Sequence, residues 1–239
     1  MKLLDLTLPT PAENLALDEA LLEAAEIGDL ADEVLRLWEL PAPAVIIGRS
    51  SKIAEEVNLP VAESLQIPVL RRASGGAAIV AGPGCLMYSV VLRYAGREHL
   101  RLLDEVHRHV LGIIRSALAP LADGIEHLGT SDLALNNRKF SGNSLRCKRD
   151  HLLYHGTILY NYDLTLIPQL LKTPPRQPEY RENRPHTDFI TNLPLTASTL
   201  RDALTTAFNA AHPLINLPQA QTTHLLTTRY SQPAWNLSR

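Results

Sequence analysis

A stretch of apolar runs and glycine breaks at residues 69–92, VLRRASGGAAIVAGPGCLMYSVVL, constrains the fold of this chain more than any other segment. Its three short apolar runs are separated by glycine-containing breaks at residues 75–76 and 82–84. Glycine and proline clusters between such runs are typical of turns between β-strands. We therefore predict three strands in a hairpin-like meander, at residues 69–70, 77–80 and 85–92.

The first glycine break has the features of a ligand-binding loop. Gly75 and Gly76 lack Cβ atoms, so the backbone there can adopt positive φ and a ligand can lie against the main chain. The preceding Arg71 and Arg72 carry fixed positive charges on planar, multidentate donors. This combination suits a long ligand with an anionic part, although a plain β-meander whose glycines only form turns would have the same residues.

Composition places the chain among ordinary globular proteins. Its 239 residues are 45% hydrophobic and 20% charged, which allows one large domain, or a domain with a small appendage, around a real core. The net charge of −2 gives no reason to expect a nucleic-acid or anionic-membrane partner. Two cysteines without disulfide or metal-ligand spacing favour a reducing compartment. An acidic N-terminus and the lack of a long apolar run argue against a signal peptide or membrane span, so we expect a cytoplasmic protein.

Hydrophobic periodicity predicts further elements on both sides of this stretch. One helix begins near Ala12 and ends at Gly28, and the clearest helix covers residues 98–118. Residues 171–193 are rich in proline and arginine and predict no regular element. The other predicted elements are strands at residues 3–8, 35–40, 44–48, 132–135 and 152–160, and helices at residues 57–65 and from Thr196 or Ser198 onward.

A second hairpin is predicted around Lys139. Asn136-Asn137 forms its tight turn, and Lys139 lies in a short strand before Gly142, flanked by small residues. A lysine there, facing the glycine loop, is a candidate contact to an acyl carbonyl or a phosphate oxygen, although a solvated edge-strand lysine is the plainer explanation. The histidines have no partner at metal-ligand spacing, so we predict no resident metal site. In the polar tail, Tyr230 and Trp235 are candidate docking anchors.

Five segments together resemble a known family. They are NLALDEALL, LRLWELPAPAVIIGR, RRASGGAAIVAGPG, NRKFSGNSLR and HGTIL, in this order within roughly residues 12–195. They are similar to the lipoate–protein ligase and octanoyltransferase family, whose catalytic domain is shared with biotin–protein ligases. The resemblance implies an α+β fold with a mixed, largely antiparallel β-sheet flanked by helices. It also implies a catalytic domain at residues 1–195, with the helix and tail of residues 196–239 packed on the same domain.

The resemblance also implies roles for individual residues. Lys139, in the K-x-S-G motif, would be catalytic and would contact the acyl carbonyl and the phosphate of an acyl adenylate. The implied acyl-binding residues are Arg72, Ser74, Gly75, Gly76, Ala77, Ala78, Gly142, His155, Gly156 and Thr157. The implied nucleotide-binding residues are Gly82, Gly84, Cys85 and Lys139.

The chain departs from the family pattern at the nucleotide end. Ala77 replaces a usual third glycine, Ala81-Gly82 a frequent His-Asp, and Gly84-Cys85 a frequent Gly-Asn. Ligases that make their own adenylate often have a further C-terminal domain, whereas roughly 45 residues follow Leu195 here, too few for a second core. These departures question adenylate formation from ATP more than acyl binding.

Transferases of the family carry the acyl group on a cysteine thiolate. Neither Cys85 nor Cys147 stands at the position of such a cysteine. Arg146 and Lys148 would nevertheless provide the cationic surroundings that activate a thiolate at Cys147. A covalent route through Cys147 therefore stays open at this point.

The sequence thus predicts an acyltransferase of the lipoate–protein ligase type. Its cofactors would be ATP with Mg²⁺, or preformed lipoyl-AMP, with lipoate as the substrate. Its partner would be a lipoyl carrier domain of the 2-oxoacid dehydrogenase E2 or glycine cleavage H-protein type, with or without a separate accessory ligase subunit. Two alternatives remain: an octanoyl or lipoyl transferase acting between carrier proteins, and a catalytically degenerate lipoyl-binding module.

Overall fold

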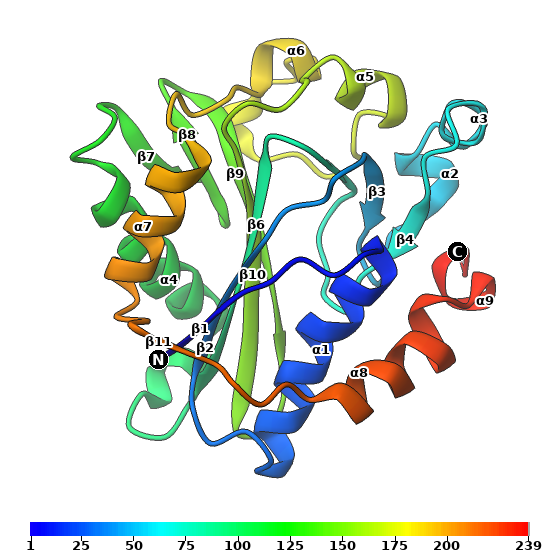
Figure 1. Ribbon diagram of the computed structural model, residues 1–239. Coiled ribbons are helices and arrows are strands. Elements are labelled where there is room, and N and C mark those ends of the chain that lie inside the picture. The colour runs from blue at the N-terminus through cyan, green and yellow to red at the C-terminus, as the bar shows by residue number, and fades with distance from the viewer. Residues whose placement is uncertain (239) are drawn as a thin grey trace.

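The computed structural model describes residues 1–238. In it the chain folds into two β-sheets with helices packed around them (Figure 1). The strands of the larger sheet are β1 (Lys2–Asp5), β2 (Val34–Trp38), β6 (Cys85–Arg93), β7 (Ile125–Leu128), β8 (Asp132–Leu135), β9 (Arg138–Cys147), β10 (His151–Leu159) and β11 (His212–Pro213). Their order across the sheet is β11-β1-β2-β6-β10-β9-β8-β7. The β1 strand runs parallel to β2 and β11, and the other pairings are antiparallel. This arrangement confirms the predicted mixed, largely antiparallel sheet.

The smaller sheet consists of β3 (Ala44–Ile47), β4 (Val69–Arg71) and β5 (Ile79–Ala81). The central strand is β3, which pairs in parallel with β4 and antiparallel with β5. The three strands predicted around the glycine breaks therefore form, but the predicted hairpin-like meander is wrong. Both β4 and β5 pair with β3 instead of with each other, and β6 belongs to the larger sheet. Residues 72–78 must consequently cross from one side of β3 to the other.

Nine α-helices surround the sheets within the described residues. They are α1 (Pro11–Ile27), α2 (Ile53–Glu56), α3 (Leu59–Ser64), α4 (Leu103–Leu118), α5 (Leu166–Leu170), α6 (His186–Phe189), α7 (Ala197–Ala207), α8 (Gln219–Leu225) and α9 (Pro233–Asn236). Short 3-10 turns cover Glu98–Arg101 and Glu179–Arg181, and a π-helical turn covers Leu226–Tyr230. Among residues 1–238, no helix is long and apolar enough to span a membrane.

Local signals explain where the main helices begin and end. A capping box between Thr10 and Glu13 starts α1, and Gly28 in the left-handed conformation ends it, as predicted. Thr196 caps α7 through its side chain, also as predicted. The predicted helix over residues 98–118 is divided, because Leu102 has extended backbone angles between the 3-10 turn and α4.

The larger sheet carries a helical layer on each face (Figure 1). Consecutive β6 side chains point to opposite faces of the sheet, as the pleat of a strand requires. Leu86, Tyr88 and Val90 pack in the apolar cluster that contains α4 and α7, whereas Val91 packs with α1. A third apolar cluster joins the smaller sheet to α5, α6 and the C-terminal segment.

The hairpin around Lys139 is longer than predicted. Asn136 and Asn137 have positive φ values of 50° and 61°, which confirms the tight turn. The following strand, β9, continues past Gly142 to Cys147, because it pairs with β8 up to Gly142 and with β10 from Asn143 onward. The basic run at residues 146–149 suggests a turn in the sequence, but Arg146 and Cys147 lie in the strand.

The proline- and arginine-rich segment is less irregular than predicted. It contains α6 and the 3-10 turn at Glu179–Arg181. Tertiary contacts stabilise α6: the Arg138 guanidinium on β9 donates to the carbonyl oxygens of Thr187 and Ile190. Contacts of this kind between distant segments have no signature in the local sequence.

Candidate active site

Two contiguous cavities lie between the smaller sheet, β9 and β10. The larger has a volume of about 390 Å³ and the smaller about 110 Å³. We call the residues that line both cavities the junction: Ala77, Ala78, Ile79, Lys139, Gly142 and Thr157. The structure therefore brings the glycine loop and the lysine hairpin together, although they are about sixty residues apart in sequence.

The buried Arg72 guanidinium organises the glycine loop, residues 72–78. It donates to the carbonyl oxygens of Ile46, Gly75 and Ala77 and to Ser74 Oγ, over distances of 2.5–3.1 Å. Burial lowers the pKa of Arg72 to about 10, so the group stays charged at neutral pH. Arg72 lines the larger cavity, but most of its donors already bind the loop. Its main observed effect is to hold the loop's shape.

Close backbone contact explains two glycines near this loop. A Cβ atom on Gly48, at the end of β3, would lie 1.9 Å from the carbonyl oxygen of Gly76. Gly76 itself has a φ of +90°, which L side chains rarely adopt. Beyond it, the Ala78 amide donates to Glu56 Oε2 at 2.6 Å. Glu56 was not singled out in the sequence, because its α2 helix is a short element far from the loop.

Lys139 is paired with a carboxylate in the junction. Its Nζ lies 2.7 Å from Asp132 Oδ1, and 29% of the lysine side chain is exposed. The Tyr180 hydroxyl donates to Asp132 Oδ2 at 2.8 Å. Burial, reinforced by the Asp132 carboxylate, raises the pKa of Tyr180, so this phenol remains a donor. Neither Asp132 nor Tyr180 was predicted from the sequence as a site residue. The only local signal for Asp132 is its position across the hairpin from Gly142.

Glycines give the lysine and the strand beside it room. A Cβ atom on Gly142 would lie 2.8 Å from Lys139 Nζ. On β10, a Cβ atom on Gly156 would lie 1.7 Å from Asn143 Oδ1. Gly142, Gly156 and Thr157 all line the larger cavity. Their small size keeps the cavity open next to the lysine.

A buried polar chain leads from the loop into the core. His155 lines the larger cavity, and its Nε2 lies 2.6 Å from Ser74 Oγ. Its Nδ1 lies 4.0 Å from Asp18 Oδ2, and Asp18 Oδ1 accepts from Arg36 and Ser89. Burial alone would raise the pKa of Asp18, but the charge of Arg36 and contact with His155 hold it below its ordinary value. The Ser74 contact therefore connects the histidine ring to the loop.

The residues implied for nucleotide binding lie elsewhere, apart from Lys139. A Cβ atom on Gly82 would meet Pro43, and one on Gly84 would meet the Asn161 backbone at 2.1 Å. Cys85 is fully buried in the apolar core, where burial raises its pKa to about 12. None of the three lines either cavity. The two glycines allow close packing at the turn between β5 and β6, and nucleotide binding by these three residues stays a prediction.

The segment between α5 and α6 forms the outer wall of both cavities. Arg176 and Pro178 line the larger cavity, whereas Lys172 and Arg181 line the smaller one. Apolar side chains from β5 and from Phe189 line the smaller cavity together with Lys172 and Arg181. The arrangement can hold an apolar chain and can neutralise anionic oxygens near Lys139.

These features define a class of protein: an α+β fold whose apolar cavities meet at a lysine, suited to binding an acyl chain with an anionic head. Residues 10–209 match the family model of the lipoyl protein ligase A/B catalytic domain, and the chain belongs to that family.

Similar proteins include both ligases and transferases. A probable lipoate-protein ligase A of Mycoplasma genitalium is 32% identical over 161 residues, covering 67% of this chain and 46% of the relative. The octanoyltransferase LipM of Carboxydothermus hydrogenoformans is 31% identical over 184 residues, covering 67% of this chain and 65% of the relative. The chain spans about half the length of the Mycoplasma ligases that it matches.

Solved structures share the fold over the whole chain. A bi-partite lipoate protein ligase from Thermoplasma acidophilum, studied with its E2 lipoyl domain, superposes with a TM-score of 0.82 at 22% identity, covering 99% of this chain and 95% of that chain. A lipoate-protein ligase A bound with ATP gives a TM-score of 0.77 at 22% identity, covering 99% and 98% of the two chains. At these identities the likeness concerns the fold.

Proposed function

We propose that this protein transfers lipoate, or a related medium-chain acyl group, from an acyl adenylate to a lysine of a lipoyl carrier domain. The observation that carries the proposal is the junction, where two apolar-walled cavities meet at Lys139 beside the glycine loop. The names of similar proteins support it, since they include both lipoate-protein ligases and octanoyltransferases.

The reaction needs no protein nucleophile when the donor is a mixed anhydride. The carrier's neutral lysine amine attacks the acyl carbonyl, the amide bond forms, the bond to the phosphate oxygen breaks, and AMP leaves while the amine loses a proton. The protein must hold both reactants in line and offset charge on the carbonyl and phosphate oxygens. Lys139 supplies that charge once it turns from Asp132 toward the donor. Main-chain N–H groups of the glycine loop are further donors.

Acyl binding is assigned to the larger cavity in this proposal. Ala77, Ala78, Gly156 and Thr157 line it with little bulk, and Arg72 and His155 add polar contacts. Ser74 and Gly75 do not line it but bind the residues that do: Ser74 contacts His155, and Gly75 accepts from Arg72. The four residues from Arg72 to Gly75 thus shape the wall, whereas the residues after them face the ligand.

ATP with Mg²⁺ is a chemically suitable source of the adenylate. Mg²⁺ held with a nucleotide uses one or two carboxylates together with the phosphates. The cavities are lined by two carboxylates, Glu56 and Asp132. Asp132 Oδ1 becomes free when Lys139 turns toward the donor, so Asp132 is the residue that would hold the ion. The ion would neutralise phosphate charge. Lys172 and Arg181 would add fixed positive charge in the smaller cavity.

The partner in this proposal is a lipoyl domain of the E2 type, the kind of domain with which the Thermoplasma ligase was studied. The proposal also includes a glycine cleavage H-protein as an alternative carrier, a separate accessory ligase subunit and a cytoplasmic location. These three rest on the sequence alone.

A transferase acting between carriers is the second candidate, and the similarity to LipM favours it. It would need a reactive thiolate, which Cys85 cannot supply at neutral pH because of its burial. Cys147 is exposed at the far end of β9, outside the residues that line either cavity. The geometry therefore favours transfer from an adenylate.

Mass spectrometry of a lipoyl domain tests these alternatives. We expect a lipoyl adduct after incubation with the protein and lipoyl-AMP, and far less of it with the Lys139→Ala variant. An adduct formed only from an acylated carrier would identify the transferase instead. Lipoate binding without any adduct would identify a binding module.

A further inference from the structure

The C-terminal segment reaches the glycine loop from outside the cavities. We call residues 219–238, which contain α8, the π-helical turn and α9, the C-terminal clasp. The clasp runs beside α1 and ends next to β4 (Figure 1). Its last helix places Trp235 and Asn236 against Arg71, the residue immediately before the glycine loop.

The clasp takes the place of a neighbouring strand along β4. This strand is at the edge of the smaller sheet, where backbone groups lack a strand partner. The Arg71 amide donates to Asn236 Oδ1 at 3.1 Å, and Trp235 Nε1 donates to the Arg71 carbonyl oxygen at 2.8 Å. In return, Arg71 Nε donates to the Trp235 carbonyl oxygen at 3.1 Å. The backbone at the start of the glycine loop is thus fixed by side chains from the end of the chain.

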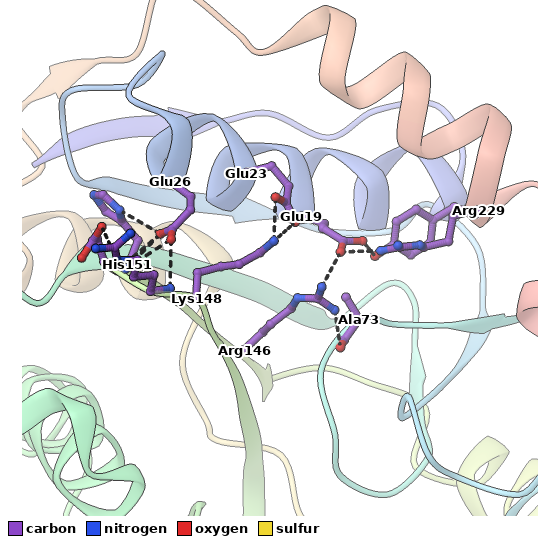
Figure 2. A network of polar contacts seen from close by, with 11 residues as sticks. Glu19, Glu23, Glu26, Ala73, Arg146, Lys148, His151 and Arg229 are labelled. Atoms are coloured by element: carbon purple, nitrogen blue, oxygen red, sulfur yellow. Dashed lines mark hydrogen bonds and ion pairs between the residues drawn. The ribbon is translucent and has the colours of Figure 1, made fainter.

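A second connection runs through Glu19 of α1 (Figure 2). This buried carboxylate accepts from Arg229 and from the Tyr230 hydroxyl, both in the clasp. It also lies 3.4 Å from Arg146 Nη2, and Arg146 Nη1 donates to the Ala73 carbonyl oxygen at 3.1 Å. The clasp therefore has two connections to the loop. One is direct and ends at Arg71, next to the first loop residue, and the other runs through Glu19 and Arg146 to Ala73.

We propose that Trp235 and Asn236 are positioning residues that keep the glycine loop in its acyl-binding shape. The inference rests on the proposed function for its substrate, the acyl donor. The loop contains two consecutive glycines and crosses from one side of β3 to the other, so its conformation needs support at its ends. Glu56 binds its C-terminal end at Ala78, and the clasp binds its N-terminal end.

Conservative variants separate positioning from general stability. Trp235→Phe keeps an aromatic ring near Arg229 and Tyr230 but removes the N–H that binds Arg71. Asn236→Leu removes both the acceptor for the Arg71 amide and the donor to the Tyr230 carbonyl oxygen, whereas Asn236→Asp retains the acceptor and loses only the donor. Leu237→Ala, at an exposed side chain of the same helix end, is the matched control.

The first readout is hydrogen exchange of the amides of residues 72–78 in the full chain. We expect Trp235→Phe and Asn236→Leu to exchange roughly three- to tenfold faster there, which corresponds to one lost hydrogen bond. Asn236→Asp should restore protection, and Leu237→Ala should not change it. The second readout is transfer kinetics. In Trp235→Phe and Asn236→Leu the KM for lipoyl-AMP should rise by a similar factor, whereas kcat and the KM for the lipoyl domain should stay unchanged.

The outcomes distinguish this inference from the proposed function. Equal exchange of residues 72–78 in all four variants and the wild type would overturn the clasp's role, whatever the activity. A rise in the KM for the lipoyl domain alone would also overturn it. Faster loop exchange in a protein that transfers no acyl group would support the clasp and reject the proposed function.

Discussion

Lys139 Nζ lies 2.7 Å from Asp132 Oδ1, so the lysine at the junction of the two cavities has a carboxylate partner. Asp132 is itself held by the Tyr180 hydroxyl. An anionic donor must compete with Asp132 for the lysine. Asp132 therefore holds the positive charge of Lys139 at a defined position in the cavity, and the lysine can still exchange Asp132 for an anionic donor.

We predict that Lys139→Ala loses most acyl transfer while the protein stays folded. The side chain is partly exposed, and pairs of this kind contribute about 1 kcal/mol or less to stability. Its charge, however, faces developing negative charge in the transition state. Transfer is measured by mass spectrometry of the lipoyl domain, and folding by thermal unfolding. Lys52→Ala, at an exposed lysine, is the control. Near-normal transfer by Lys139→Ala would contradict the proposed role.

The cysteines should be dispensable if the donor is an adenylate. Burial raises the pKa of Cys85 to about 12, so almost none of it is thiolate at pH 7. We expect Cys85→Ala and Cys147→Ser each to keep substantial activity. Iodoacetamide should label the exposed Cys147 in the folded protein and Cys85 only after unfolding. A thioester trapped on Cys147, with loss of activity in Cys147→Ser, would instead establish the covalent transferase.

Transfer from preformed lipoyl-AMP should be faster than the complete reaction from lipoate and Mg-ATP. Using an adenylate requires an acyl groove, a phosphate contact and access for the amine, whereas making one also requires ATP phosphates and Mg²⁺ in line. The two rates are compared on one lipoyl domain, with and without a candidate accessory subunit. Asp132→Asn should slow the ATP-dependent reaction more than transfer from lipoyl-AMP. Equal wild-type rates from both donors would show that this chain forms the adenylate efficiently.

Glu26 should make stability depend on acid pH. Its carboxylate accepts from the backbone amides of Arg149, Asp150 and His151 in the turn between β9 and β10 (Figure 2). Burial alone would raise its pKa, but these hydrogen bonds outweigh burial and lower it from the ordinary 4.5. The stabilisation is therefore present above about pH 4.5 and is lost as the pH falls through the lowered value.

Glu26→Gln should lower the free energy of unfolding by about 1–2 kcal/mol at pH 7, as expected for lost hydrogen bonds to a charged acceptor. The difference from the wild type should shrink as the pH falls below 4.5, because the wild-type carboxylate then becomes protonated first in the unfolded chain and, at lower pH, in the folded protein. Urea unfolding at pH 7 and in the acid range measures it. Glu63→Gln, at an exposed site, is the control. A difference that stays constant down to pH 3 would contradict the assignment.

Much of the fold could be predicted because its signals are local. The capping residues of α1, the left-handed Gly28 and the paired asparagines before β9 each determine the backbone within a few residues. The glycine loop and Lys139 were also recognisable, since both belong to short motifs. The structure brings them to the same junction.

Strand partners and charge partners were decided by tertiary structure. Nothing in residues 69–92 indicates that β4 and β5 pair on opposite sides of β3, because a strand's partner depends on which other strands the fold brings beside it. For the same reason, the motif around Gly82, Gly84 and Cys85 did not indicate that the two glycines pack closely on distant segments or that the cysteine is fully buried.

The sequence by itself determined many of the longer elements, the family and the two motifs that meet at the junction, because each rests on neighbouring residues. Only the tertiary structure decided that Asp132 holds Lys139, that Glu56 binds the end of the glycine loop, and that the C-terminal clasp supports its start. The physical reason is that hydrogen bonds and ion pairs act over about 3 Å. Residues such as Arg71 and Trp235, distant in sequence, come within that range only when the whole chain has packed.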